Sequence, residues 1–241
     1  MIEYPCSHIK SKFMRKIILL AAGFLIGGAA ANAQTAASKT SAVGTTKFGL
    51  KVGANIAKYS FHVNNGTNPE TNNLLNFGIT GYADLPLGGT FGLQPGLSLQ
   101  GKGGEFSDNG TTEVKQSTMW LEVPVNLVAR IPLAAGGTNF FLGAGPYAAV
   151  GIAGQNKAET KLNGTETTTN TDVKFGDEAG KDLKTMDYGF NFLGGVQLGS
   201  GINVSAGYGL GINDLRPKNQ PNNNDLKQTN RVLSFSVGYA F

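Results

Sequence analysis

Residues 230–241 read NRVLSFSVGYAF, and this stretch at the C-terminal end of the sequence decides the fold class. Large apolar side chains occupy every second position, with small residues between them: Leu233, Phe235, Val237, Tyr239 and Phe241 against Ser234, Ser236 and Gly238. Successive side chains of a β-strand point to opposite faces of the sheet. The stretch is therefore predicted to be a strand with one bulky apolar face and one small polar face.

The same alternation with period two recurs in seven earlier stretches, namely residues 48–56, 75–85, 91–102, 119–130, 140–152, 188–198 and 202–212. Each is about the length that a tilted strand needs to cross the hydrocarbon of a membrane, roughly 9–11 residues. The facing of residues 140–152 is ambiguous, because small apolar residues fill both sets of positions.

Long and short links alternate between these stretches. The long links are residues 59–73, 103–117, 153–186 and 214–229, and the short links are residues 86–90, 131–139 and 199–201. Outer-membrane barrels combine short periplasmic turns with long outer loops. The fold class predicted is all-β: an eight-stranded antiparallel up-and-down transmembrane β-barrel over residues 46–241. The third long link is polar and is expected to be a mobile outer loop.

A soluble exported barrel of the lipocalin type would alternate in the same way, with its apolar face lining a ligand pocket. Here the second face is rich in Gly, Ser, Asn and charge, which suits a tight interior with lipid outside. Aromatic residues near strand ends favour the membrane barrel: Tyr59, Trp120, Tyr188 and Tyr239. Three prolines lie inside predicted strands, and because proline cannot donate to a ladder we expect a β-bulge at each: Pro95, Pro124 and Pro146.

The N-terminal residues have the pattern of a secretory signal peptide. Arg15 and Lys16 precede an apolar run over residues 17–31, and Ala31 and Ala33 form a small-residue cleavage site before Gln34. The run is too short for a membrane-spanning helix, which needs about 20 residues. We therefore assign residues 1–33 to an N-terminal extension and a signal peptide, and residues 34–45 to a flexible periplasmic strip. Because Met14 directly precedes Arg15, residues 1–13 are interpreted as an over-extended start.

Removal of residues 1–33 leaves a nearly neutral protein. Of 20 basic residues, four lie in the removed segment, and of 16 acidic residues one does, so the mature charge is 16 − 15 = +1. We therefore expect no nucleic-acid partner. Cys6, the single cysteine, also leaves. No disulfide, no cysteine-based metal site and no cofactor is expected.

Charged residues also fall on the small polar face: Lys47, Lys51, Lys102 and Arg130 against Asp84, Glu122 and Asp187. Buried charges must pair, so we predict an inward network of ion pairs that fills the barrel. The alternative is a narrow polar pore. Eight strands leave an interior only wide enough for side chains, which favours the filled interior.

Several stretches carry a resemblance to a known family. These are GLKVGANIAKY (49–59), LEVPVNL (121–127), FLGAGPYAAVGI (141–152), YGLGINDL (208–215) and the C-terminal NRVLSFSVGYAF. The chain resembles the small outer-membrane β-barrel proteins of Bacteroidetes, described as porin-family or PorT-family proteins. The resemblance implies the barrel fold and an outer-membrane location. The aromatic ending with Tyr239 and Phe241 is similar to the signal that outer-membrane assembly machinery reads.

The function expected first is non-enzymatic: a structural or envelope role, or docking of a protein partner at the long outer loops. Outer-membrane lipid and the assembly machinery are the other expected partners. The alternatives are a minor pore and a rim-located lipid-modifying enzyme. The enzyme would use His62 near Ser60, but a catalytic base must be oriented by a third group, and the spacing of residues indicates none.

Overall fold

The computed structural model describes residues 44–63, 71–108, 112–133, 136–162, 165–217 and 226–241. These residues form nine strands: β1 (Lys47–Val63), β2 (Leu74–Gly88), β3 (Phe91–Asp108), β4 (Thr112–Pro132), β5 (Asn139–Leu162), β6 (Thr165–Asp172), β7 (Met186–Gln197), β8 (Ile202–Gly211) and β9 (Leu226–Ala240). Within these ranges, no helix has the length and apolar character needed to cross a membrane. The predicted signal peptide and its cleavage site lie outside the described residues.

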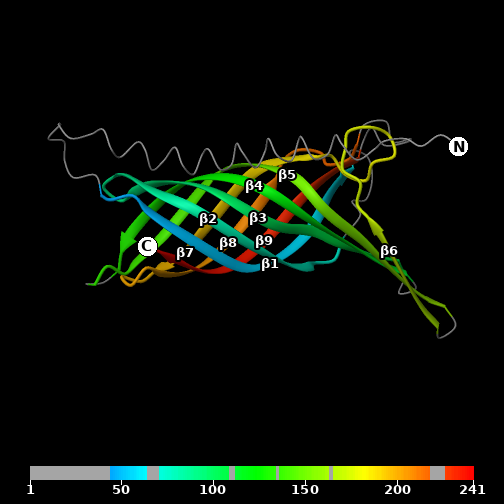
Figure 1. The fold of residues 1–241 in the computed structure, drawn as a ribbon, viewed down its shortest axis with the longest axis horizontal. Helices are drawn as coiled ribbons and strands as arrows, with labels where there is room; N and C mark the ends of the chain where they lie inside the picture. The colour runs from blue at the N-terminus through cyan, green and yellow to red at the C-terminus, as the bar shows by residue number, and fades with distance from the viewer. Residues whose placement is uncertain (1–43, 64–70, 109–111, 134–135, 163–164, 218–225) are drawn as a thin grey trace, which may run out of the picture. The chain divides into compact units, whose positions relative to one another are not determined.

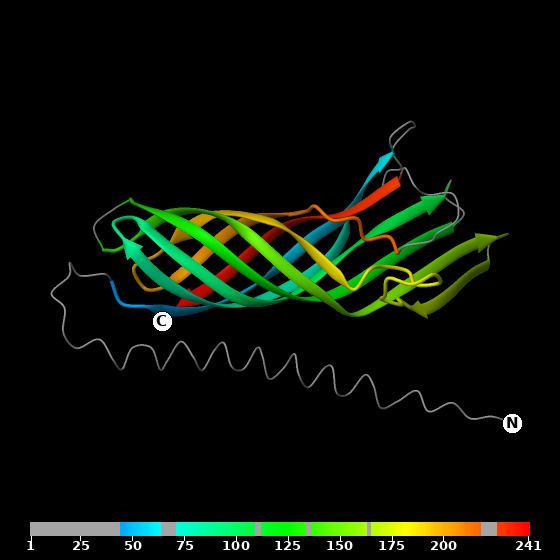
Figure 2. The ribbon, with the colours of Figure 1, turned by 90° about the horizontal axis from the view of Figure 1, so that it is seen from above.

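Eight of the strands close into an antiparallel ring. Their order is β4-β3-β2-β1-β9-β8-β7-β5, and β5 pairs back with β4. The strands wind around a common axis in Figures 1 and 2. The predicted eight-stranded antiparallel barrel is therefore confirmed. The C-terminal residue lies at one end of the barrel and β6 lies beyond the other end (Figure 1).

The strands run further into the long links than the alternation predicted. β5 continues to Leu162, and β6 pairs with it from Leu162↔Thr165 to Gln155↔Asp172. Ten of the residues assigned to the third long link thus extend β5, and eight more form an additional strand. The expectation of a loop over residues 153–186 is therefore wrong for these segments, whereas their mobility stays a prediction. Threonine-rich segments pair readily as strands because β-branched side chains suit an extended backbone.

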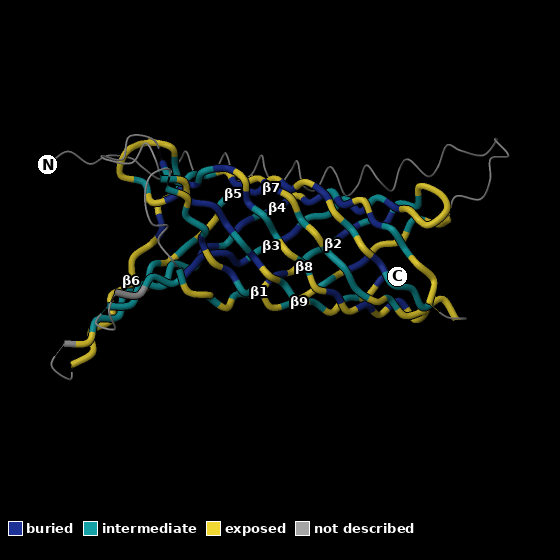
Figure 3. Tube along the Cα trace, turned by 180° about the vertical axis from the view of Figure 1, so that it is seen from behind, coloured by how far each residue is buried: buried dark blue, intermediate teal, exposed yellow. Residues whose placement is uncertain are grey.

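Burial alternates along much of the ring, so that exposed and buried positions follow one another along the tube in Figure 3. On β4, Trp120, Glu122, Asn126 and Val128 are buried, whereas Val123 and Leu127 between them are half exposed. The outward residues form an apolar belt around the ring, which includes Phe48, Leu50, Val52, Leu75, Phe77, Leu99, Val123, Leu127, Phe190, Phe192, Leu233, Phe235 and Val237. An outward apolar belt is what a barrel presents to lipid.

The ambiguous fifth stretch is also resolved. On β5, Phe141, Tyr147 and Ala149 are buried, and Leu142 between them is half exposed. Tyr147 and Phe141 therefore point inward, and the small residues of this strand leave room for them.

The prolines do not produce the bulges that were expected. In each of three ladders, two consecutive residue pairs are missing, and one of the two includes a proline. These prolines are Pro95 in the β2–β3 ladder, Pro124 in the β3–β4 ladder and Pro146 in the β4–β5 ladder. The register is the same on both sides of each gap. The missing proline N–H thus costs ladder hydrogen bonds without inserting a residue. The register shifts instead at Pro86/Gly88 and at Met119/Trp120.

The short link between β2 and β3 needs glycine. Gly88 and Gly89 have φ angles of 106° and 59°, and only glycine adopts such angles without steric cost. The backbone can therefore reverse within residues 88–90 at the end of the barrel where the C-terminal residue lies.

Candidate functional site

The barrel interior contains an ion cluster that joins three strands. Lys102 of β3 places its Nζ 2.8 Å from Glu122 Oε2 on β4 and 3.0 Å from Asp187 Oδ2 on β7. All three side chains are buried. The cluster brings together three residues of the predicted inward network, and their contacts span the interior.

Neutral donors add hydrogen bonds to the two carboxylates, although Asp187 Oδ1 is buried without a partner among the described residues. Tyr147 Oη and Asn230 Nδ2 donate to Asp187 Oδ2, and Asn191 Nδ2 donates to Glu122 Oε1. Lys102 Nζ also lies 4.2 Å from the centre of the Tyr147 ring, within the range of a cation–π interaction. The sequence interpretation missed these three donors. The polar positions of Asn191 and Asn230 could have indicated them, whereas the facing of Tyr147 was ambiguous.

The other members of the predicted network lie apart from this cluster. Arg130 of β4 pairs with Asp84 of β2. Lys51 Nζ lies 4.7 Å from the centre of the Tyr82 ring, so an aromatic face takes the place of the expected carboxylate. Lys47 is exposed at the start of β1 and forms no ion pair with another described residue, so its place in the network stays a prediction. The ends of the strands project beyond the packed interior. At these ends both faces of a strand meet solvent, so alternation no longer decides which side chains are exposed.

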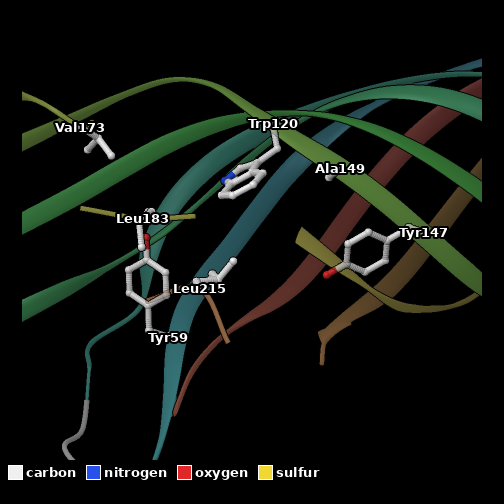
Figure 4. Packing of buried hydrophobic residues seen from close by; sticks show 7 residues of the cluster. All are labelled: Tyr59, Trp120, Tyr147, Ala149, Val173, Leu183 and Leu215. Atoms are coloured by element: carbon white, nitrogen blue, oxygen red, sulfur yellow. The ribbon is translucent and has the colours of Figure 1, made fainter. Parts of the chain in front are cut away.

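A cluster of apolar side chains fills the interior at the end from which β6 projects. Its buried members are Tyr59, Trp120, Tyr147, Ala149, Val173, Leu183 and Leu215 (Figure 4). Tyr59 and Trp120 are 2% and 0% exposed. Their prediction as interfacial aromatics near strand ends is therefore wrong, whereas Tyr188 and Tyr239 are half exposed on the outside.

Two segments between strands supply part of this cluster. Val173 and Leu183 come from residues 173–185 between β6 and β7, and Leu215 comes from the residues that follow β8. Residues 173–185 are fixed by backbone hydrogen bonds from Val173 N to Gly154 O and from Gly151 N to Thr185 O, both 2.9 Å. The Phe175 ring packs edge-on against Trp120, with centroids 5.4 Å apart. A Cβ atom on Gly151 would lie 2.3 Å from Phe175, so glycine is required for this close approach. The segment therefore covers the interior as a packed element.

Little empty space remains inside the ring. A cavity of about 100 Å³ is lined by Lys51, Gln100, Lys102, Glu122, Asn126 and Tyr147 among others. A cavity of this size has room for a few water molecules, since each needs roughly 10–15 Å³ of such volume. Within the described ranges, no group of His, Cys, Asp or Glu residues has the arrangement of a metal site. The interior is thus a filled polar core with a small polar cavity.

Beyond the ring, the ends of four strands form a second feature, which we call the projecting sheet. It consists of residues 103–108 of β3, 112–117 of β4, 155–162 of β5 and all of β6. Its surface carries exposed or partly exposed ion pairs between neighbouring strands, such as Lys115 with Glu105 and Lys161 with Glu166. Another pair, Lys157 with Glu159, lies along β5. The hydrogen bond to Glu113 raises the pKa of Lys115, and the hydrogen bond from Lys157 lowers the pKa of Glu159. Exposed pairs add little to stability.

The predicted assembly signal lies on the outer face at the opposite end of the barrel. Tyr239 and Phe241 are 50% and 69% exposed, and their rings stack with centroids 6.4 Å apart. Phe241 N donates to Phe48 O at 2.8 Å, and Phe48 N donates to Phe241 O at 3.1 Å. The C-terminal residue thus closes the seam between the first and last strands. The predicted cleavage residues Ala31, Ala33 and Gln34 lie outside the described residues.

A closed ring with an apolar belt outside and a filled polar core inside defines an integral outer-membrane β-barrel protein. The chain belongs to the outer membrane protein beta-barrel domain family, whose model matches residues 32–216. It is an integral protein of the outer membrane. No curated protein matches the chain.

Two solved structures are among those to which the chain is similar. The attachment invasion locus protein Ail of Yersinia pestis, solved with the heparin analogue sucrose octasulfate, is 12% identical, with 82% of this chain and 100% of that chain covered and a TM-score of 0.39. Neisserial surface protein A is 14% identical over the same shares of the two chains, also with a TM-score of 0.39.

Proposed function

We propose that this chain is a non-enzymatic docking protein of the outer membrane, which holds a protein partner on the projecting sheet by adding a partner strand to β6. The observation that carries the proposal is the edge of β6. All eight of its residues are exposed, and among the named strands it pairs only with β5. Exposed strand edges present unpaired N–H and C=O groups that a second chain can use.

The composition of β6 supports this role. Proteins usually protect edges with proline, lysine or a bulge, and TETTTNTD contains no proline and no lysine. Its central residues are β-branched or polar, which favours strand pairing without making the edge hydrophobic. Its position beyond the ring, at the end with the long links, supports a location outside the membrane.

The hydrogen-bonding pattern of the hairpin shows which groups are available. The pair Leu162↔Thr165 leaves two residues between the strands, so this pair exchanges both of its hydrogen bonds and the next pair exchanges none. It follows that Thr167 directs its N–H toward β5, whereas Thr168 and Asn170 direct theirs away. The latter two are the donors that we expect a partner strand to use.

Two alternatives have less support. A pore needs a continuous open path, and the Lys102–Glu122–Asp187 cluster with the apolar cluster above it occupies that path. A rim-located enzyme would need an oriented base, and within the described residues His62 has no hydrogen-bond partner. We also place the chain among the small barrels of Bacteroidetes, because the quoted stretches resemble them, and propose that Tyr239 and Phe241 engage the assembly machinery.

The test uses a photo-crosslinking amino acid at position 170 in intact cells. We expect one crosslinked protein whose yield falls about tenfold in Thr168→Pro, since proline removes a hydrogen bond and obstructs its neighbours. Thr168→Val is the matched control because it keeps the N–H, and its yield should equal that of the wild type. A crosslink that is insensitive to Thr168→Pro, or none at all, would contradict strand addition at β6.

A further inference from the structure

Four basic or titratable side chains gather on the outer face of β1 and β9, just beyond the apolar belt. Lys58 pairs with Arg231 and His62 pairs with Lys227 in the register of the two strands. Lys58, His62 and Lys227 are exposed and Arg231 is half buried. We call these four residues the cationic patch.

The patch faces outward because strand alternation continues from the belt. Ile56 pairs with Leu233, the last apolar outward pair of these two strands, and Lys58 and Arg231 follow two residues later. Two residues of a strand span about 7 Å. The first cations therefore lie at the height where lipid hydrocarbon gives way to headgroups.

The patch is not balanced by acids. Within the described residues, no carboxylate forms an ion pair with any of its four side chains. Like charges directly opposite each other on neighbouring strands are destabilising. An anion between Lys58 and Arg231 would remove that cost.

A groove next to the patch offers both polar and apolar contacts. β8 ends at Gly211, whereas β9 extends further, and the resulting groove of about 410 Å³ is lined by Leu210, Ile212, His62, Lys227, Thr229 and Arg231 among others. Apolar residues from β8 thus adjoin cations from β9. This combination suits an amphiphile whose charged headgroup sits above its acyl chains.

The guanidinium of Arg231 is fixed in position by hydrogen bonds to the backbone. Its Nη1 donates to Gly211 O at 2.7 Å and to Asn230 O at 2.8 Å, which fixes the guanidinium across the end of β8. Within the described residues, Nε and Nη2 have no hydrogen-bond partner. A planar guanidinium with free donors recognises phosphate oxygens in a bidentate manner.

From these contacts we infer that the cationic patch and its groove form a binding site for the phosphorylated headgroup of an outer-leaflet lipid. Arg231 and Lys58 hold the phosphate, Lys227 and His62 extend the site away from the membrane, and Leu210 with Ile212 contacts the start of an acyl chain. The site is separate from β6 and does not depend on a docked protein.

The experiment measures lipid binding by native mass spectrometry of the full chain in neutral detergent. The probes are diphosphorylated lipid A, its dephosphorylated form and inorganic phosphate. We expect the phosphorylated lipid to bind, and Lys58→Gln/Lys227→Gln to weaken it roughly twenty-five-fold, at about fivefold for each removed cation. Arg231→Gln should weaken it further.

Controls separate the site from general charge. Lys157→Gln/Lys161→Gln removes two exposed lysines of the projecting sheet and should leave lipid binding unchanged. The Lys58 and Lys227 side chains form no hydrogen bond within the described residues, so that double variant should keep the barrel folded even where Arg231→Gln does not. Equal binding of the dephosphorylated lipid, tight binding of phosphate alone, or equal loss in both lysine pairs would overturn the inference.

Discussion

Lys102 Nζ on β3 lies 3.0 Å from Asp187 Oδ2 on β7, although 85 positions separate the two residues in the chain. These strands are not neighbours in the ring, because β4 and β5 stand between them. The ion pair therefore crosses the interior, and Glu122 joins it from β4. Side chains that reach across the ring fill the barrel. Because the interior is filled, a binding surface for a partner or a lipid has to lie on the outside.

Breaking the ion cluster should destabilise the barrel strongly. Lys102→Met leaves two buried carboxylates without their cation, and we expect the free energy of unfolding to fall by about 3–5 kcal/mol. Urea titration of the protein in lipid vesicles measures this change. The triple variant with Glu122→Gln and Asp187→Asn should recover most of the loss, and Lys157→Met, which disrupts an exposed pair, should cost below about 1 kcal/mol. An equally small effect of Lys102→Met would contradict the role of the cluster.

The filled interior predicts that the wild-type protein conducts no steady ion current. Lys102, Glu122 and the buried Trp120 leave a cavity of only about 100 Å³, and eight-stranded barrels have room for little more than side chains. Planar-bilayer recording tests this, with a large porin in the same membrane as the positive control. Reproducible unit conductance from the folded protein would favour the pore instead.

Gly151 should be intolerant of any side chain. A Cβ atom would lie 2.3 Å from Phe175, so Gly151→Ala should lower the free energy of unfolding by about 1–3 kcal/mol through overpacking. Adding Phe175→Ala should make the alanine at position 151 less costly, which a double-mutant cycle in urea detects. Gly81→Ala is the control, since a Cβ there meets no atom within 4 Å. Additive effects of the two substitutions would refute the contact.

The C-terminal aromatic residue should matter for assembly. Deletion of Phe241 removes two backbone hydrogen bonds with Phe48 and an exposed ring, and we expect a smaller fraction of the protein to reach the membrane in folded form. Heat-modifiable migration on gels measures that fraction. Phe241→Tyr keeps both the ring and the backbone bonds and should assemble normally. Normal folding of the deletion variant would argue against an assembly signal.

Processing of the N-terminal segment gives a further test. Mass spectrometry of the protein from membranes should find Gln34 as the first residue, since small side chains at Ala31 and Ala33 fit the cleavage pattern. Ala33→Arg should leave an uncleaved precursor, whereas Ala33→Ser should be processed. A mature N-terminus elsewhere would refute the assignment.

The sequence by itself determined the strands of the ring and their membrane-facing side. Alternation needs only the period of an extended backbone, and the contrast between Leu233, Phe235 and Val237 and the serines between them is local. Link lengths then set the antiparallel order. This is why eight ring strands could be predicted, together with the inward facing of Lys102, Glu122 and Asp187.

Tertiary structure alone decided which of these residues meet and where each strand ends. Alternation assigns a face but no height along the barrel axis, and height depends on register and on shifts such as the one at Met119/Trp120. For that reason Lys102 could not be matched with Asp187 in advance, and Lys51 met Tyr82 instead of an acid. Trp120 shares the inward face of Glu122 by alternation, and only tertiary structure decided that Phe175 from a distant segment covers it.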